Sequence, residues 1–385
     1  MDYLLTEDQI MIRDLARQIA VEKIVPVRAE LDEHNRFPTE IMKAMAQADL
    51  FGIYIPEEYG GLGKKSLDLY IAIEEISKAC LGVSTCYAAN ALGSYPILLY
   101  GSEAQKKKYI PDIASGKDFV AFGLTEANAG SDASGIQTTA KLEGNEYVLN
   151  GTKQWITNGG EARIYTVIAI TDKSKGARGA SAFIVEKGTP GFTFGKKENK
   201  MGIRASSTTE LIFNNCRIPK ENLISREGMG FIVAMKTLDI SRAGVGSQGV
   251  GVAQGAIDEC IKFAKGRIQF GQPITSFQAI QHMLADMQTQ TEAARALVYA
   301  AARMMDSGAK DFSRESAMAK VFATDVAMKV TTDAVQVMGG SGYMKEYPVE
   351  KMMRDAKILQ IYEGTNQVQR NVIALDMIRE ATKKK

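Results

Sequence analysis

A glutamate near the C-terminal end is the first candidate for chemistry. Glu363 follows the apolar residues Ile358, Leu359 and Ile361 and precedes Gly364. If this run buries the carboxylate, the charged form loses hydration and its pKa rises towards neutrality, which suits a general base. A glutamate in such a place is more often a partner of a helix N-terminus, so the pattern alone leaves both interpretations open.

Two further segments have the composition of a site for a flat, polar ligand. Residues 121–132 place small and hydroxylated residues after a predicted strand, which lets backbone N–H groups and hydroxyls approach a ligand. Trp155 is the only tryptophan, and Thr157 follows two positions later. An aromatic surface beside a hydroxyl suits an aromatic cofactor that needs stacking and one directed hydrogen bond. Taken singly, the first segment is more often a tight turn, and Trp155 is as often a core residue of a hairpin.

The elements that must position these residues begin as helices. Residues 6–118 have helical periodicity, and Thr6-Glu7-Asp8-Gln9 is typical of a capping box that opens a helix. The glycine-rich stretch 57–63 interrupts the pattern, and a second long helix is predicted from about Ser66 to Cys80.

The pattern then changes to strands and back to helices. Between about Phe119 and Pro219, short β-type runs follow one another without intervening helices, which favours an antiparallel barrel or sandwich over a doubly wound dinucleotide fold. After Gly228, long amphipathic helices joined by short loops predict a four-helix bundle. We therefore expect an α+β protein with an N-terminal all-α domain (1–118), a middle β-barrel domain (119–228) and a C-terminal helical bundle (229–385).

Composition excludes several other classes of protein. The chain has 385 residues with 47 basic and 45 acidic side chains, so no bulk charge points to nucleic acid. Four scattered cysteines and two histidines form no cluster that would hold a metal, so no metal site is expected. The first residues lack a basic segment followed by an apolar one, and no apolar run is long enough to span a bilayer. We expect a cytoplasmic protein.

The order and spacing of these segments resemble the acyl-CoA dehydrogenase flavoprotein family over essentially the whole chain. The resemblance rests on Pro56-Glu57-Glu58-Tyr59-Gly60-Gly61, on Leu124-Thr125-Glu126 through Gly130-Ser131-Asp132, on Trp155-Ile156-Thr157-Asn158-Gly159, on Arg267-Ile268-Gln269-Phe270-Gly271, on Gln336-Val337-Met338-Gly339-Gly340-Ser341-Gly342-Tyr343 and on Tyr362-Glu363-Gly364-Thr365. It implies a helical N-terminal domain, a β-barrel and a C-terminal bundle that hold FAD and an acyl thioester between them.

The resemblance also implies roles for individual residues. Glu363 would be the base that removes the α-proton of the acyl-CoA, and the Thr157 hydroxyl would donate to flavin N5. The other residues implied to contact FAD are Phe122, Leu124, Thr125, Gly130, Ser131, Trp155, Ile156, Thr365 and Gln367, together with Arg267, Phe270, Gln278, Gln336, Gly339 and Gly340, of which Arg267 and Phe270 would reach the FAD of a neighbouring subunit. Those implied to contact the substrate are Ser131, Tyr87, Asp239, Arg242, Tyr362 and Gly364.

Some family members carry the catalytic glutamate on the helix of the Asp-x-x-Arg pair. Here Ile240 and Ser241 lie between Asp239 and Arg242, and neither can act as a base, which leaves Glu363. The implied product is a trans-2-enoyl-CoA, the implied electron acceptor is an electron-transfer flavoprotein, and the implied assembly is a homotetramer. Small Ala88 and Ala89 in residues 83–92 favour a short-chain, branched or alicyclic acyl group.

Other functions remain open at this stage. Glu363 argues against a flavin monooxygenase, and an acyl-CoA oxidase of this scaffold is usually longer. The same site could run in reverse as an enoyl-CoA reductase. A non-catalytic scaffold that binds CoA esters is a further alternative, against which Glu363 and the Trp155-Ile156-Thr157 segment both argue.

Overall fold

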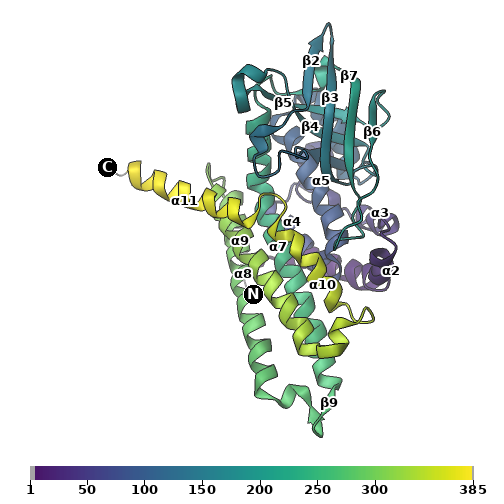
Figure 1. Cartoon of the computed structure of the whole chain (residues 1–385), viewed down its shortest axis with the longest axis vertical. Helices are drawn as coiled ribbons and strands as arrows, with labels where there is room; N and C mark the ends of the chain where they lie inside the picture. The colour runs from purple at the N-terminus through teal and green to yellow at the C-terminus, as the bar shows by residue number, and fades with distance from the viewer. Residues whose placement is uncertain (1–4, 384–385) are drawn as a thin grey trace.

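Helices occupy the two ends of the chain and strands its middle, in the order that the sequence predicts. The computed structural model describes residues 5–383. In Figure 1 strands β2 to β7 gather at the upper end of an elongated molecule, and long helices run from there to the lower end, where β9 lies.

The N-terminal helices are α1 (Glu7–Ile19), α2 (Arg28–Glu33), α3 (Thr39–Gln47), α4 (Ser66–Ala79), α5 (Leu81–Tyr100) and α6 (Glu103–Ala114). The predicted capping box is confirmed: Gln9 N donates to Thr6 Oγ1 at 3.3 Å, and Thr6 N donates to Gln9 Oε1 at 3.1 Å. The long helix predicted from Ser66 is α4.

Helix α5 is buried along most of its length, because small and apolar side chains cover all its faces. It contacts α4 and α7 on one side and β1 and β4 on the other. Some of its polar side chains bond within the helix; for example, Thr85 Oγ1 donates to Leu81 O at 2.9 Å. A helix that is apolar all round is expected to be buried, and α5 therefore connects the helical and β regions.

The strands are β1 (Val120–Gly123), β2 (Thr139–Glu143), β3 (Glu146–Thr157), β4 (Ile164–Ile170), β5 (Ala180–Glu186), β6 (Phe192–Phe194), β7 (Thr208–Pro219) and β8 (Leu223–Ile224). They pair in the order β6-β7-β3-β2-β4-β5-β8, with β1 added to β4. Most pairs are antiparallel as expected, but β1 and β2 both pair with β4 in parallel. The sheet is thus mixed at β4, because the chain crosses over between β3 and β4 instead of turning back as a hairpin.

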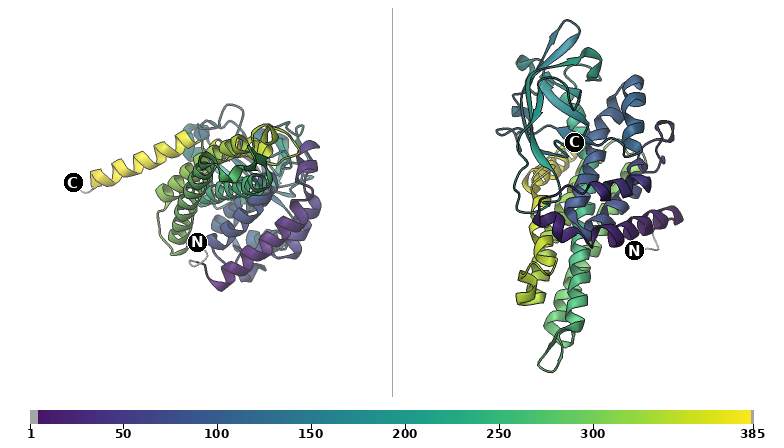
Figure 2. Two further views of the ribbon diagram at one scale, coloured as in Figure 1. Left: turned by 90° about the horizontal axis from the view of Figure 1, so that it is seen from below. Right: turned by 90° about the vertical axis from the view of Figure 1, so that its right-hand side faces the viewer.

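The C-terminal part contains α7 (Gly230–Gly266), β9 (Ile268–Gln269), β10 (Gln272–Pro273), α8 (Gln278–Asp306), α9 (Ser313–Met338), α10 (Val349–Ala356) and α11 (Asn366–Lys383). Helices α7, α8 and α9 pack against one another, and α10 lies against α9. Two glycines of α7 allow close approach: a Cβ at Gly251 would lie 2.2 Å from Glu74 O, and one at Gly249 would lie 2.8 Å from Ala323 O. Helix α11 extends away from the body of the molecule. Both the view in Figure 1 and the view from below in Figure 2 show this.

Two kinds of feature are absent from residues 5–383. None of the helices in this range is both long and apolar enough to cross a membrane. In the same range, no three His, Cys, Asp or Glu side chains gather in a way that would hold a metal ion.

Candidate active site

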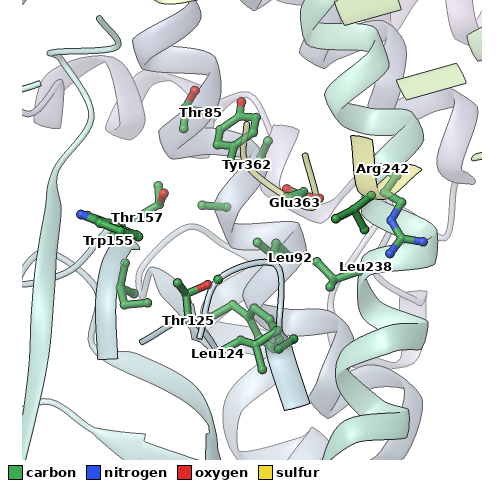
Figure 3. A pocket seen from close by; sticks show the side chains of 18 of the residues that line it. Thr85, Leu92, Leu124, Thr125, Trp155, Thr157, Leu238, Arg242, Tyr362 and Glu363 are labelled. Atoms are coloured by element: carbon green, nitrogen blue, oxygen red, sulfur yellow. The ribbon is translucent and has the colours of Figure 1, made fainter. Parts of the chain in front are cut away.

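One pocket brings the three candidate segments together. It encloses about 220 Å³ between α5, the β1–β2 loop, β3, α7 and the loop before α11. In Figure 3, Trp155 and Thr157 lie on one side, Leu238 and Arg242 on the opposite side, and Glu363 between them. The predicted residues that line it are Phe122, Leu124, Thr125, Gly130, Ser131, Trp155, Ile156, Thr157, Arg242, Tyr362, Glu363 and Gly364.

Trp155 reaches the pocket through an irregularity in strand β3. The pairing of β3 with β7 shifts between Lys153 and Ile156, and Trp155 has a left-handed φ of 59°. A bulge of this kind turns a side chain out of its regular alternation. As a result, the indole is 55% exposed although it belongs to a strand of the main sheet.

A buried ion pair between Lys153 and Glu126 holds the β1–β2 loop in place. Lys153 Nζ donates to Glu126 Oε1 at 2.8 Å and to Leu124 O at 3.0 Å, and the lysine is fully buried. Burial lowers the pKa of Lys153 to about 8, an effect that the Glu126 carboxylate opposes. Glu126 also accepts from Gln137 N and Thr138 N. Gln154 N donates to Thr125 O at 2.8 Å, so the loop and the bulge beside Trp155 form one unit.

Glu363 occupies a turn with unusual backbone geometry. Its φ is 53° and that of Gly364 is 89°. Ser241 Oγ donates to Glu363 Oε2 from the neighbouring helix α7. Burial raises the pKa of Glu363, and the Ser241 hydrogen bond, Lys320 and Arg242 offset part of that rise. Ser241, which cannot itself act as a base, therefore serves Glu363 as a hydrogen-bond donor.

Two donors in the pocket wall have no protein acceptor among residues 5–383. Arg242 Nη1 donates to Asp239 Oδ1 at 2.6 Å, but Arg242 Nε has no partner within residues 5–383. Gln248 Oε1 accepts from Tyr362 Oη at 2.6 Å, whereas Gln248 Nε2 lacks a partner in the same range. Both residues are buried and line the pocket. Since buried donors are normally paired, a ligand with oxygen acceptors fits this wall better than a purely apolar one.

The remaining predicted contacts fall outside this pocket. Tyr87 points into the core, where its hydroxyl donates to Leu50 O at 2.7 Å and its ring packs on Phe51. The structure therefore does not bring Tyr87 to the site, since its position on α5 faces away from residues that do line the pocket. Thr365 and Gln367 flank the lining residues Gly364 and Val368, and Asp239 contributes through Arg242.

A second pocket holds another part of the predicted set. It encloses about 540 Å³ at the lower end of the molecule, near β9 in Figure 1. Arg267, Phe270, Gly339 and Gly340 line it, whereas Gln278 and Gln336 are adjacent in sequence to lining residues. Within one chain, β9 lies at the lower end of the molecule and β3, which carries Trp155, near the upper end (Figure 1).

Several pocket residues were not identified from the sequence. On α5 these are Thr85 and Leu92, on the same face as the predicted Ala88 and Ala89, and on α7 they are Met235 and Leu238, which precede the predicted Arg242. These positions follow the three-to-four-residue period of a helix face. The period is visible in the sequence, but it indicates pocket residues only when the face of the helix that meets the site is known. No comparable signal marks Gln248, because its neighbours on α7 are small and apolar on every side.

Comparison with known proteins gives the relationship of the whole chain. The models described as acyl-CoA dehydrogenase N-terminal, middle and C-terminal domains match residues 6–117, 121–216 and 228–378. The chain belongs to the acyl-CoA dehydrogenase family. Members of this family are FAD-dependent oxidoreductases, and the resemblance seen in the sequence is thereby confirmed.

Individual relatives align along almost the full length. The chain is 49% identical over 381 residues to the acryloyl-CoA reductase (NADH) of Anaerotignum propionicum, covering 98% of this chain and 96% of the relative. The structure of butyryl-CoA dehydrogenase from Megasphaera elsdenii superposes with a TM-score of 0.96 at 47% identity, covering 98% of this chain and 100% of that one. A chain of the structure described as "Electron transferring flavoprotein of Acidaminococcus fermentans: Towards a mechanism of flavin-based electron bifurcation" gives a TM-score of 0.96 at 52% identity, with the same coverage.

Proposed function

We propose that this protein oxidises a saturated acyl-CoA to the trans-2-enoyl-CoA, with Glu363 as the base for the α-proton. The observation that carries the proposal is the position of the Glu363 carboxylate in the same pocket as Trp155 and Thr157 (Figure 3). Glu363 can act as a base on one side of the cavity, and Trp155 and Thr157 can hold a flat redox cofactor on the other. This arrangement suits the removal of a proton and a hydride from adjacent carbons of a substrate between them.

The pocket residues fit FAD as well as the substrate. The exposed Trp155 face and the Thr157 hydroxyl would hold the flavin ring, and the loop with Thr125, Gly130 and Ser131 would bring hydroxyl and N–H donors to it. The chemistry that FAD supplies in this family is two-electron acceptance of the β-hydrogen as hydride. The second pocket, with Arg267 and Phe270, supports our proposal that another copy of the chain completes the cofactor site.

The chain's own residues account for the proton. Glu363 must be ionised to accept the α-proton, and Ser241 keeps one carboxylate oxygen oriented by donating to it. Because burial raises the pKa of Glu363, the carboxylate is a stronger base than an exposed glutamate. The two electrons of the broken α-C–H bond form the new C=C bond as the β-hydrogen leaves, so the thioester loses one proton and one hydride.

The finer assignments extend this proposal. We propose a short-chain, branched or alicyclic acyl group, since small Ala88 and Ala89 line the pocket and a butyryl-CoA dehydrogenase is among the similar structures. We also propose electron-transfer flavoprotein as the electron acceptor, supported by the structure from Acidaminococcus fermentans to which the chain is similar. Asp239 and Arg242 would contact the CoA moiety, and Thr365 and Gln367 the FAD diphosphate.

A second candidate is the reverse reaction, the reduction of an enoyl-CoA. The observation that favours it is the 49% identity to an acryloyl-CoA reductase. In that direction the protonated Glu363 would return the proton to the α-carbon, so the same residues serve both reactions. Which direction the protein catalyses is decided by its redox partners and not by the pocket.

The test is anaerobic bleaching of the flavin in the purified protein. Butyryl-, isobutyryl-, octanoyl-, glutaryl- and cyclohexanecarbonyl-CoA are compared in the wild type and in Glu363→Gln. We expect at least one acyl-CoA to bleach the wild type, and Glu363→Gln to retain flavin and bind the ester but react slower by several orders of magnitude. Wild-type rates in Glu363→Gln would overturn the assignment of the base, and bleaching by none of the esters would favour the reductase direction.

A further inference from the structure

A buried lysine lies directly behind the turn that carries Glu363. Lys320 belongs to α9 and is fully buried. Its Nζ donates to Gly364 O at 2.8 Å and to Asn366 Oδ1 at 2.8 Å. Neither acceptor carries a formal charge, so these bonds hold the backbone of the turn without neutralising the lysine.

The turn needs such support because its backbone is strained. Glu363 and Gly364 both have left-handed φ values, which a glutamate rarely adopts unless the surrounding contacts impose them. Gln369 Nε2 donates to Glu363 O at 2.9 Å, and Lys320 donates to the next carbonyl. Asn366, the second acceptor of Lys320, is fixed in turn by bonds from its Nδ2 to the α9 side chains Thr324 (2.9 Å) and Asp325 (2.7 Å).

The charge of Lys320 also acts on the candidate base. The charged groups that face it are Glu363, Arg242 from α7 and Asp325 from α9. Arg242 already pairs with Asp239, and Asp325 pairs with Arg370 at 2.7 Å. Burial lowers the pKa of Lys320 to about 7, and the carboxylate of Glu363 opposes that shift. Lys320 in return lowers the pKa of Glu363, so each charge favours the other.

We propose that Lys320 is a positioning residue for this reaction, which holds the Glu363–Gly364 turn through the Gly364 carbonyl and stabilises the ionised form of Glu363. The inference rests on the proposed role of Glu363 as the base. Lys320 acts through Glu363 and touches neither the proposed substrate nor the cofactor pocket.

Two substitutions separate the roles of hydrogen bonding and charge. Lys320→Gln keeps an N–H donor but removes the charge, whereas Asn366→Ala removes one acceptor and leaves the charge. Lys329→Met is the matched control, because Lys329 lies on the same helix with its side chain 54% exposed. The first readout is a difference infrared titration of the Glu363 carboxyl group, with Glu363→Gln as reference, and it needs no substrate. The second is the rate of flavin reduction by butyryl-CoA.

For Lys320→Gln we expect the carboxyl titration to move to higher pH and the rate at neutral pH to fall at least tenfold. For Asn366→Ala we expect a slower rate with little change in the titration, and for Lys329→Met no change in either. An unmoved titration in Lys320→Gln overturns the proposal. Should Lys320→Gln fail to fold, Asn366→Ala decides: a wild-type rate overturns the positioning role. If no acyl-CoA reduces the wild type, the proposed function fails, but the infrared titration still tests the effect of Lys320 on Glu363.

Discussion

At the scale of single residues, the contact between Ser241 and Glu363 links the site to pH. Ser241 Oγ donates to the carboxylate and lowers the pKa of Glu363, against the effect of burial. Since the base must be ionised, activity is expected to rise as the pH increases through that pKa. In Ser241→Ala the ionised form loses a donor, so the acid limb of the kcat/KM profile should move to higher pH. At a fixed pH on that limb we expect a loss on the order of tenfold, as for one hydrogen bond to a charged group.

The control for this prediction is Ser307→Ala, because Ser307 is an exposed serine whose hydroxyl donates to Met304 O. Its pH profile should match that of the wild type. An acid limb that stays in place in Ser241→Ala would show that the contact does not influence the ionisation of Glu363.

Single residues also show what the sequence could and could not predict. Glu363 was identified because the motif around it is distinctive, and Ser241 only as a position that cannot supply a base. The sequence does not single out Lys320, since a lysine on an amphipathic helix is normally exposed, even where the neighbours on its face are as small as Ala317 and Ala323. Tyr87 was placed on the right helix, but the face of that helix that meets the pocket depends on how α5 packs between α7 and β1.

At the scale of elements, one face of α5 limits the room for the acyl group. Ala88 and Leu92 line both the main pocket and a narrow extension of about 20 Å³ that also reaches Gln248 and Glu363. In Ala88→Leu the added carbons should fill this extension. We expect kcat/KM to fall tenfold or more for octanoyl- and cyclohexanecarbonyl-CoA and much less for butyryl-CoA, because one to three kcal/mol is about what a methylene group contributes in such a pocket.

The comparison variant is Leu99→Ala, on the same helix with 44% of the side chain exposed and outside the main pocket. It should leave the preference among the three esters unchanged. If kcat/KM fell equally for all three esters in Ala88→Leu, the substitution would be disturbing the catalytic groups and not the acyl end of the pocket.

The elements themselves were easier to predict than their junctions. Helical periods located α1 and α4, and the changes of period located the β region and the later long helices, because these depend on local side-chain patterns. The bulge at Trp155 and the parallel pairing of β1 with β4 depend on strands that are distant in sequence. No local sequence pattern therefore predicts them.

At the scale of the whole molecule, the predicted cofactor contacts lie in two separate pockets. Trp155 and Thr157 line one, whereas Arg267 and Phe270 line the other, near the far end of α7. Phe270 is 91% exposed, an unusual position for a phenylalanine in a chain that works alone. Two copies of the chain in contact would allow Arg267 of one to reach the cofactor of the other, as the family resemblance implies.

This arrangement predicts that an arginine remote from the catalytic pocket controls cofactor retention. We expect Arg267→Ala to lose FAD on dialysis, with affinity weaker by about tenfold to a hundredfold, as for one charge-assisted contact. The flavin-to-protein ratio and the mass by light scattering are measured together. The wild type should have a mass that corresponds to two or more copies of the 41.9 kDa chain. Lys265→Ala, two residues earlier and also exposed, is the control and should keep its flavin. A monomeric wild type that retains FAD, or an Arg267→Ala variant with unchanged flavin, would mean that one chain alone provides the whole cofactor site.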